Sequence, residues 1–491
     1  MAGDPSRQTV SAVLDHAAAS YIDAEAVVDG DIRLTYGDLR ASVRTAARAL
    51  AGMGVRPGER VALCAPNSAH WVVAALGVLD AGGVLVPINT RYTATETLDI
   101  VQRSNARVLL VEGSFLGRDR LAELEALSPD LPTSVRLPVE WVAADAELPV
   151  VTPDQLCDVM YTSGTTGRSK GAMSAHRQSL GVAGAWASCA ELTSADRYLI
   201  VNPFFHTFGY KAGILACLLS GATIVPQPVF DVVETMRLVE RERITVLPGP
   251  PTIYQAMLDH PDRSSFDLSS LRIAVTGAAV VPVALIERMQ AELVSTVLTA
   301  YGLTEAVVAT MCRPSDPPST IAHTCGVPMA DFELRLGERD EVLLRGPNVM
   351  LGYLDDPEAT AAAVDADGWL HTGDVGRISE DGYLSITDRL KDMYICGGFN
   401  VYPAEVEQAL ARLAGVAESA VVGMADARLG EVGVAHVVTS PGSSLTSDEV
   451  IAFCRERLAN YKVPRAVEFH PALPRNAMGK VLKTQLRKEN A

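Results

Sequence analysis

The sequence lacks the features that direct a chain to a membrane, to nucleic acid or to a disulfide framework. Its 491 residues carry a net charge of -17, whereas a nucleic-acid or anionic-membrane surface needs a basic patch. The eight cysteines include no C-x-x-C pair, so they indicate neither a zinc site nor a set of disulfides. The N-terminus has no basic segment followed by an apolar core, and Asp80 interrupts the apolar run from Trp71 to Ile88. We therefore expect a soluble, cytoplasmic protein without a transmembrane segment or a nucleic-acid partner.

The composition is that of a globular protein, with 48% hydrophobic and 21% charged residues. The chain is too long for one ordinary core. Short apolar runs such as 61–64, 84–88 and 271–275 alternate with helix-like segments such as 70–79, before which Asn67 is a candidate cap. This alternation predicts an α/β fold.

The segment from Tyr161 to Met173 concentrates glycines, hydroxyls and one lysine in a single loop. Such a loop can wrap phosphate, because glycines let the backbone approach an anion and hydroxyls donate hydrogen bonds. Ser169 stands where a Walker A loop needs its second glycine, so the ordinary P-loop is excluded. A flexible surface turn is the alternative. The residues expected to hold phosphate are Thr162, Ser163, Gly164, Thr165, Thr166, Gly167 and Lys170.

Two further segments carry candidate site residues. Between Asn202 and Gly213, His206 and Lys211 stand among aromatic residues that include Phe208 and Tyr210; the alternative is core packing around a satisfied histidine. The segment 300–305 reads Ala-Tyr-Gly-Leu-Thr-Glu and offers an aromatic face, a hydroxyl and a carboxylate. A base could stack on the tyrosine, and the carboxylate suits Mg²⁺.

The C-terminal part contains three more candidates. Asp374 ends the segment Gly-Trp-Leu-His-Thr-Gly-Asp and could accept hydrogen bonds from ribose hydroxyls. From Lys391 onward, short strands and helices form a small α+β unit, with Thr446 and Glu449 as a capping box. Lys480 follows a glycine near the end of the chain. Taken alone, Asp374 is more often a turn residue or helix cap, and a lysine such as Lys480 is usually just solvated.

Taken together and in this order, the segments from Tyr161 to Lys480 resemble those of the adenylate-forming superfamily of acyl-CoA synthetases, luciferases and peptide-synthetase adenylation domains. The resemblance implies a large N-terminal α/β domain of several subdomains (1–390) and a small, mobile α+β domain (391–491) that turns about Lys391. It assigns catalysis to Lys480, Thr304, Glu305 and His206, with Glu305 also as the magnesium ligand. His206, Phe208, Tyr210 and Lys211 are assigned to the acyl substrate. The nucleotide and CoA sites would use the phosphate loop together with Gly277, Ala278, Ala279, Ala300, Tyr301, Gly302, Asp374, Arg389, Gly397 and Gly398.

The implied reaction joins a carboxylic acid to CoA through an acyl-AMP intermediate, with ATP and Mg²⁺ as cofactors. No aspartate occurs between Pro203 and Gly213, which disfavours the amino-acid substrates of peptide-synthetase domains. Segments 202–213, 246–255 and 389–407 look like those of bacterial CoA ligases that activate the propanoate side chain of an indanedione intermediate in steroid-ring breakdown. Three alternatives stay open: a medium- or long-chain fatty acid CoA ligase, an acyl-AMP ligase and a nucleotide-binding non-enzyme. A homo-oligomer is also left open.

For such a fused-ring acid, we expect Lys211 or Tyr210 to donate a hydrogen bond to a ring ketone. A buried ammonium without a partner is costly. The alternative is therefore that Lys211 supports the fold through a carboxylate that the sequence does not reveal.

Overall fold

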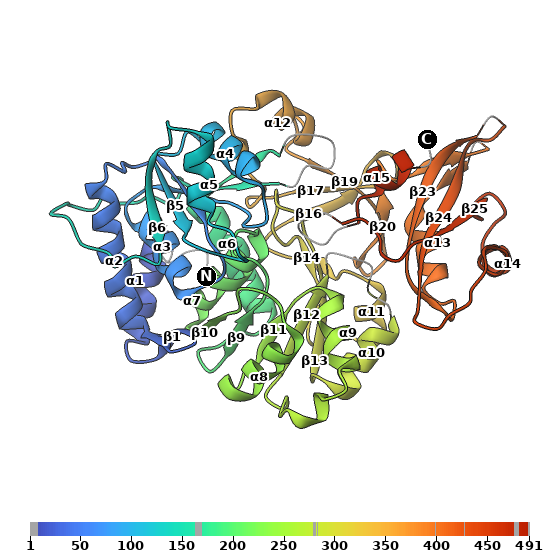
Figure 1. The fold of residues 1–491 in the computed structure, drawn as a ribbon, viewed down its shortest axis with the longest axis horizontal. Helices are drawn as coiled ribbons and strands as arrows, with labels where there is room; N and C mark the ends of the chain where they lie inside the picture. The colour runs from blue at the N-terminus through green and yellow to red at the C-terminus, as the bar shows by residue number, and fades with distance from the viewer. Residues whose placement is uncertain are drawn as a thin grey trace. The chain divides into compact units, whose positions relative to one another are not determined.

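The computed structural model describes residues 8–162, 169–277, 281, 283–397, 399–426, 428–475 and 481–489. The chain forms two compact units, whose elements are labelled in Figure 1. Unit 1 comprises Met1–Ala279, Val283–Glu333 and Leu344–Leu370, and unit 2 comprises Val280–Pro282, Leu334–Leu343 and His371–Ala491. Unit 2 thus includes residues that precede Lys391. From the sequence, the domain boundary is expected at Lys391 because the small domain would turn about this residue, and this boundary stays a prediction.

Unit 1 contains a nine-stranded sheet in the order β15-β14-β13-β12-β11-β9-β10-β1-β2. The strands from β13 to β1 are parallel, whereas β14, β15 and β2 are antiparallel to their neighbours. The strands are β1 (Glu25–Asp29), β2 (Ile32–Thr35), β9 (Arg197–Ile200), β10 (Thr223–Pro226), β11 (Val246–Pro248), β12 (Ile273–Gly277), β13 (Thr296–Tyr301), β14 (Thr310–Met311) and β15 (Val327–Pro328).

A seven-stranded sheet, also in unit 1, has the order β18-β8-β7-β4-β3-β5-β6. Its strands are β3 (Arg60–Cys64), β4 (Val84–Pro87), β5 (Val108–Glu112), β6 (Thr133–Leu137), β7 (Leu156–Tyr161), β8 (Gly171–Ala175) and β18 (Gly352–Tyr353). The strand β6 lies within 128–153, a stretch of several prolines and acidic residues without hydrophobic periodicity. It is a mostly half-exposed strand at the sheet edge, and such a strand carries little periodic signal.

Helices cover these sheets, and Figure 1 shows α8 to α10 beside the strands β9 to β13. The helices of unit 1 are α1 (Val10–Ser20), α2 (Tyr36–Gly52), α3 (Ala69–Asp80), α4 (Ala94–Arg103), α5 (Arg120–Leu127), α6 (His176–Cys189), α7 (Ala216–Ser220), α8 (Val232–Glu242), α9 (Pro251–Asp259), α10 (Val283–Glu292), α11 (Pro318–His323) and α12 (Pro357–Ala363), with the π-helix η2 (Phe208–Leu215) and the 3-10 turn η3 (Arg263–Ser265).

The helix α3 explains the long apolar run in the sequence. Its residues from Trp71 to Asp80 are all buried, and it contacts β1 of one sheet and β3 and β4 of the other. A helix that is apolar all round is a buried helix. Its N-cap is Ser68, whose side chain accepts a hydrogen bond from the Trp71 N–H, so the prediction that Asn67 caps this helix is wrong.

Unit 2 holds most of a four-stranded sheet, β16-β17-β19-β20, and a five-stranded sheet in the order β22-β21-β24-β23, with β25 paired to β24. The predicted capping box of Thr446 and Glu449 is confirmed at the start of α14. The elements are β16 (Glu333–Leu336), η4 (Glu338–Asp340), β17 (Glu341–Arg345), β19 (Leu370–Ile378), β20 (Leu384–Arg389), β21 (Tyr394–Cys396), β22 (Phe399–Val401), α13 (Pro403–Leu410), β23 (Val416–Asp426), β24 (Gly430–Thr439), α14 (Ser447–Arg457), β25 (Ala466–Phe469) and α15 (Lys483–Glu489).

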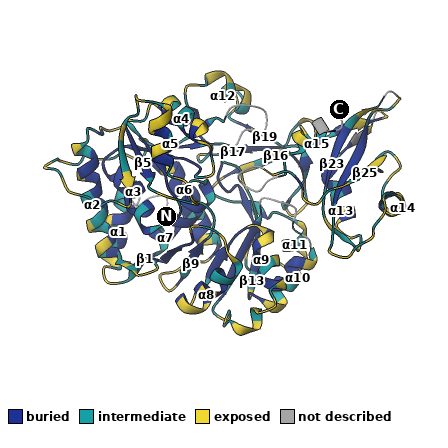
Figure 2. Ribbon diagram, viewed as in Figure 1, coloured by how far each residue is buried: buried dark blue, intermediate teal, exposed yellow. Residues whose placement is uncertain are grey.

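The cores lie where sheets and helices meet, as the dark blue strands in Figure 2 show. In unit 1, one cluster joins β3, β4 and β5 to α4 and α5, and it includes Val86, Ile100 and Leu124. In unit 2, Leu410 of α13 packs with Val421 and Val437 of the five-stranded sheet. Among the described residues, none of the helices combines the length and the apolar character that crossing a bilayer requires.

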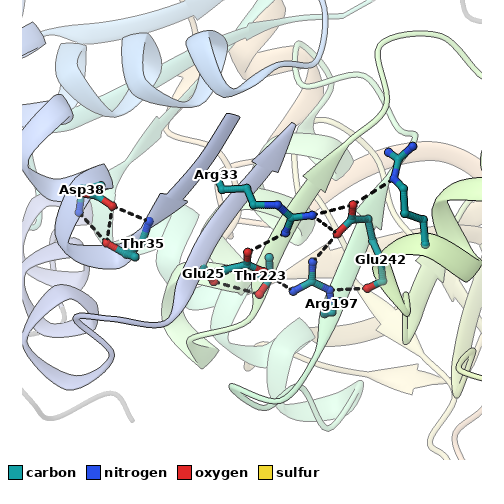
Figure 3. Close-up of polar contacts among 8 residues, drawn as sticks. Glu25, Arg33, Thr35, Asp38, Arg197, Thr223 and Glu242 are labelled. Atoms are coloured by element: carbon teal, nitrogen blue, oxygen red, sulfur yellow. Dashed lines mark hydrogen bonds and ion pairs between the residues drawn. The ribbon is translucent and has the colours of Figure 1, made fainter. Parts of the chain in front are cut away.

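An ion-pair network spans the strands β2, β1 and β9 of the nine-stranded sheet (Figure 3). Arg33 of β2 and Arg197 of β9 each bind both Glu25 of β1 and Glu242 at the end of α8, with N–O distances of 2.6 to 2.9 Å. Burial alone would raise the pKa of Glu242, but hydrogen bonds from Arg33 and Arg241 hold that pKa below its usual value. The network joins Arg33 to a carboxylate 209 residues later in the sequence.

Candidate active site

The predicted phosphate loop connects two antiparallel strands of unit 1. Thr162 follows β7, Lys170 precedes β8, and the Thr162 N–H donates to the Lys170 carbonyl at 2.8 Å. The side chain of Arg103 donates to the Ser169 carbonyl at 2.8 Å. The strand β7 thus leads directly into this loop. The predicted loop residues that lie outside the described part of the chain are Ser163, Gly164, Thr165, Thr166 and Gly167.

Two neighbouring parallel strands bring together the other predicted nucleotide residues of unit 1. Gly277, the last residue of β12, is in register with Ala300 of β13, which Tyr301 ends. A Cβ on Gly277 would clash with the Ala300 carbonyl oxygen, and one on Gly302 would clash with the backbone of Val307. Only glycine fits these two positions. Ligands of open α/β sheets bind outside such carboxyl ends of strands. Ala278 and Ala279 lie outside the described residues.

Glu305 follows Thr304 on the turn after β13 and is held by a tyrosine that sequence reasoning missed. Tyr353 Oη donates a hydrogen bond to Glu305 Oε1 at 2.6 Å, and the Lys170 ammonium lies 5.1 Å from the centre of the same tyrosine ring. Burial, and next the charge of Glu305, raises the pKa of Tyr353 well above its usual value of 10.0, so the phenol stays protonated and donates. This contact uses one oxygen of the Glu305 carboxylate, a group of the kind that suits Mg²⁺.

Strand pairing explains why Tyr353 reaches this place. Tyr353 of β18 lies opposite Ala172 of β8, close behind Lys170 in the sequence. The Met350 N–H also donates to the Glu305 carbonyl oxygen at 2.8 Å. No single-sequence signal marks Tyr353, because its partner lies 48 residues away and the pairing is a property of the sheet.

The second half of the predicted acyl segment, from Phe208 onward, lies in the π-helix η2, a rare type of element that often occurs at functional sites. Phe208, at its first residue, meets Trp186 of α6 edge to face, with ring centroids 4.8 Å apart. His206 Nδ1 accepts a hydrogen bond from the Phe208 N–H at 3.2 Å. Burial lowers the pKa of His206 to about 4. A neutral imidazole with its proton on Nε2 is therefore present at neutral pH.

Lys211 and Tyr210, which were expected to bind a ring ketone, are both fully buried. Lys211 Nζ lies 2.9 Å from Asp158 Oδ1 in an ion pair whose two side chains are both 0% exposed, and it donates to Ser174 Oγ at 2.9 Å. Tyr210 is also 0% exposed, and its hydroxyl lies 3.7 Å from Cys157 Sγ. The structure contains the carboxylate partner that the sequence offered as the alternative for Lys211. A direct role of either residue on the substrate stays a prediction.

In unit 2, two residues that were predicted to bind the nucleotide form an ion pair. Asp374 of β19 is in register with Arg389 of β20, and Asp374 Oδ1 lies 2.9 Å from Arg389 Nε. Asp374 is buried, whereas Arg389 is partly exposed. Lys391 follows β20 on a turn. Partial burial lowers the pKa of the Lys391 ammonium, and the nearby positive charge of Arg389 lowers it further.

The remaining predicted residues of unit 2 are described only in part. Gly397 follows β21 with φ +59 and is exposed. This conformation favours glycine. Gly398 and Lys480 lie outside the described residues, so the catalytic role expected of Lys480 stays a prediction.

Comparisons with known proteins identify the family of this chain. Residues 14–354 match the AMP-binding enzyme family, and residues 405–480 match the AMP-binding enzyme C-terminal domain. The chain is 60% identical to a 3-[(3aS,4S,7aS)-7a-methyl-1,5-dioxo-octahydro-1H-inden-4-yl]propanoyl:CoA ligase of Rhodococcus jostii (strain RHA1) and 59% identical to the ligase of the same name of Mycobacterium tuberculosis (strain ATCC 25618 / H37Rv), covering 98% of each chain in both cases.

A solved structure is similar over the same span. The anthranilate CoA ligase AuaEII in complex with anthranoyl-AMP has a TM-score of 0.90 and 28% identity, covering 99% of this chain and 98% of that one. The large α/β part and the smaller C-terminal part agree with the fold expected from the sequence. The chain belongs to the AMP-binding enzyme family, the adenylate-forming enzymes.

Proposed function

We propose that this protein is an ATP-dependent acid:CoA ligase whose acid is a fused-ring propanoate with two ring ketones. The observation that carries the proposal is the identity of 60% and 59% to two ligases of that name from different genera, over 98% of every chain involved. Relatives named for other acids are less similar, such as a feruloyl-CoA synthase of Amycolatopsis sp at 40% and a long-chain-fatty-acid–CoA ligase of Mycobacterium tuberculosis at 34%.

The reaction has two steps. A carboxylate oxygen of the acid attacks the α-phosphorus of ATP and pyrophosphate leaves, which gives the acyl-AMP anhydride. The thiol of CoA then attacks the acyl carbonyl and AMP leaves, which gives the thioester. The first step brings one anion to another, so positioning and positive charge are the main resources for its catalysis.

The described residues supply several parts of this scheme. Lys170 and Thr162, at the two ends of the phosphate loop, would bind the outer phosphates. Tyr301 would stack on the base. The buried Asp374, held by Arg389, would accept hydrogen bonds from the ribose.

The acyl group and the catalytic charge involve other residues. His206, which is neutral at physiological pH, and Phe208 would border the acyl group. Thr304 would donate to the α-phosphate, and Lys480 would supply the cation that the first step needs.

Glu305 fits a magnesium ion, because its carboxylate is oriented by the Tyr353 hydroxyl and hard cations take oxygen ligands. Bound there, the ion would neutralise phosphate charge. Tyr353 acts as a positioning residue that keeps the carboxylate in one orientation.

The test is a product analysis with the purified chain. ATP, Mg²⁺ and CoA are incubated with the indanedione propanoate, with ferulate and with a medium-chain fatty acid, and mass spectrometry follows the acyl-CoA and AMP. We expect the indanedione thioester with equimolar AMP, and a higher kcat/KM than for the other acids. A preferred fatty acid would refute the substrate, and acyl-AMP without thioester would refute the CoA ligase. Glu305→Gln serves as the inactive control.

A further inference from the structure

Three potential metal ligands meet on one face of the five-stranded sheet of unit 2, and none of them belongs to the site described above. His436 of β24 is in register with Glu468 of β25. His470 follows β25, and its backbone N–H donates a hydrogen bond to the Val437 carbonyl at 2.9 Å, which continues the parallel pairing of β25 with β24. Residues two apart on a strand point to the same face. Glu468 and His470 therefore project from the face that also carries His436.

The ligand atoms form a compact triangle. His436 Nδ1 lies 2.9 Å from His470 Nε2 and 3.4 Å from Glu468 Oε2, and His470 Nε2 lies 3.7 Å from that same oxygen. A tetrahedral zinc ion with bonds of about 2.0–2.2 Å holds its ligand atoms about 3.3–3.6 Å apart. The two histidine nitrogens lie a little closer than this and the His470–Glu468 atoms a little farther, so small side-chain shifts complete the geometry.

The surroundings of the triangle suit a bound ion. The His436 side chain is 0% exposed, whereas those of Glu468 and His470 are 38% and 21% exposed. On the same face of β24, His436 is flanked by Val434 and Val438, which belong to an apolar cluster with Leu473. One side of the site is thus dry and fixed, and the other is open to water.

From this geometry we infer that His436, Glu468 and His470 bind one divalent transition-metal ion, with Zn²⁺ as the best match and water in the fourth position. Two imidazoles with one carboxylate favour zinc over Mg²⁺ or Ca²⁺, which prefer all-oxygen sites. The ion would tie β25 to β24 within unit 2. The inference does not depend on the proposed ligase activity.

A hydrogen-bonded histidine pair beside a glutamate is the competing explanation. One ring N–H between His436 and His470 would account for their 2.9 Å separation without any ion. The two explanations differ in what happens when Zn²⁺ is offered, because a bound ion must displace that proton.

The experiment titrates the full-length, tag-free, chelator-treated protein with Zn²⁺ alone, in competition with a chromogenic chelator. We expect one tight site per chain. Glu468→Gln or His470→Gln should raise its Kd by about 100-fold or more, since even loss of an outer-shell partner costs 10- to 100-fold. Both positions are partly exposed, so these variants should fold, which circular dichroism checks. His323→Gln, at an exposed histidine that ends α11 of unit 1, is the matched control and should leave Kd unchanged.

Cobalt identifies the ligands. Co²⁺ at this site should give the visible absorption of a tetrahedral ion with nitrogen and oxygen ligands, and the absorption should disappear in His470→Gln. Three results would each overturn the inference. These are absence of a tight site in the unmodified protein, an unchanged Zn²⁺ affinity in both ligand variants, and the intense near-ultraviolet band of cobalt–thiolate bonds, which would place the metal on cysteines.

Discussion

Replacing Lys211 by Met should destabilise unit 1 strongly, because it removes one partner of a fully buried ion pair. Asp158 would keep the hydrogen bond from Ser179 Oγ to its Oδ2, at 2.8 Å, but would lose its cation. Breaking a buried pair by removing one partner costs about 3–5 kcal/mol because it leaves an uncompensated buried charge, and a neutral residue in place of the second partner removes that charge. We therefore expect Lys211→Met to lose about 3–5 kcal/mol of unfolding free energy, and Lys211→Met with Asp158→Asn to recover most of this loss.

Urea denaturation, monitored by tryptophan fluorescence, measures the change in the unfolding free energy of unit 1. All four tryptophans, at positions 71, 141, 186 and 369, belong to unit 1. The matched control is Arg177→Met, which breaks an ion pair of 2.6 Å with Asp154 between side chains that are 43% and 81% exposed. Exposed pairs contribute about 0–1 kcal/mol, so this control should barely change the midpoint.

Two results would refute the reasoning. One is a loss for Lys211→Met no larger than that of the control. The other is a double variant whose loss equals the sum of the losses of Lys211→Met and Asp158→Asn alone, since coupled partners must deviate from additivity. Activity adds a separate test: a structural role predicts equal losses of kcat/KM for the keto-acid and for a fatty acid, whereas a selective loss for the keto-acid would restore ketone binding by Lys211.

The remaining predictions concern three residues of the site and one buried histidine. Lys480→Ala should abolish adenylation but spare thioester formation from preformed acyl-AMP; an equal loss in both half-reactions would contradict it. Lys391→Pro should do the reverse, because proline fixes φ near -65° at the pivot, and normal turnover would place the hinge elsewhere. Tyr353→Phe should raise the Mg²⁺ concentration for half-maximal adenylation by about 10- to 100-fold, so an unchanged Mg²⁺ requirement would exclude its positioning role. Burial lowers the pKa of His176 from 6.5 to about 4, so on acidification the unfolded chain takes up the proton before the folded protein does. This histidine should therefore lower the unfolding free energy by about 2 kcal/mol between pH 7 and 5. Urea titrations at several pH values should show a smaller loss for His176→Gln.

Local signals in the sequence predicted local structure well. The capping box of Thr446 and Glu449 was found because the residues that form it lie within a few positions of one another. The apolar runs at 61–64 and 84–88 were also recognised from neighbouring residues, and they form β3 and β4. The order of the segments from Tyr161 to Lys480 then gave the family, which the comparisons confirm.

Long-range contacts were beyond the sequence. Asn67 was expected to cap α3, but its amide donates to the carbonyls of Ile200 and Asn202 and its oxygen accepts from the Phe204 N–H. These bonds to a distant segment outweigh one local cap. The partner of Lys211 was hidden for the same reason, since Asp158 lies on the strand β7 and no periodicity links the two residues.

The pairing of β1 with β10 has a consequence for how the protein is made. Val27 is in register with Ile224, so β1 leaves the ribosome about 200 residues before its parallel neighbour, an interval of about 10–40 s at 5–20 residues per second. During that interval, the edge of β1 lacks the strand β10 that pairs with it in the folded protein. A nascent chain halted before Arg197 would therefore expose a strand edge, the kind of surface that chaperones cover.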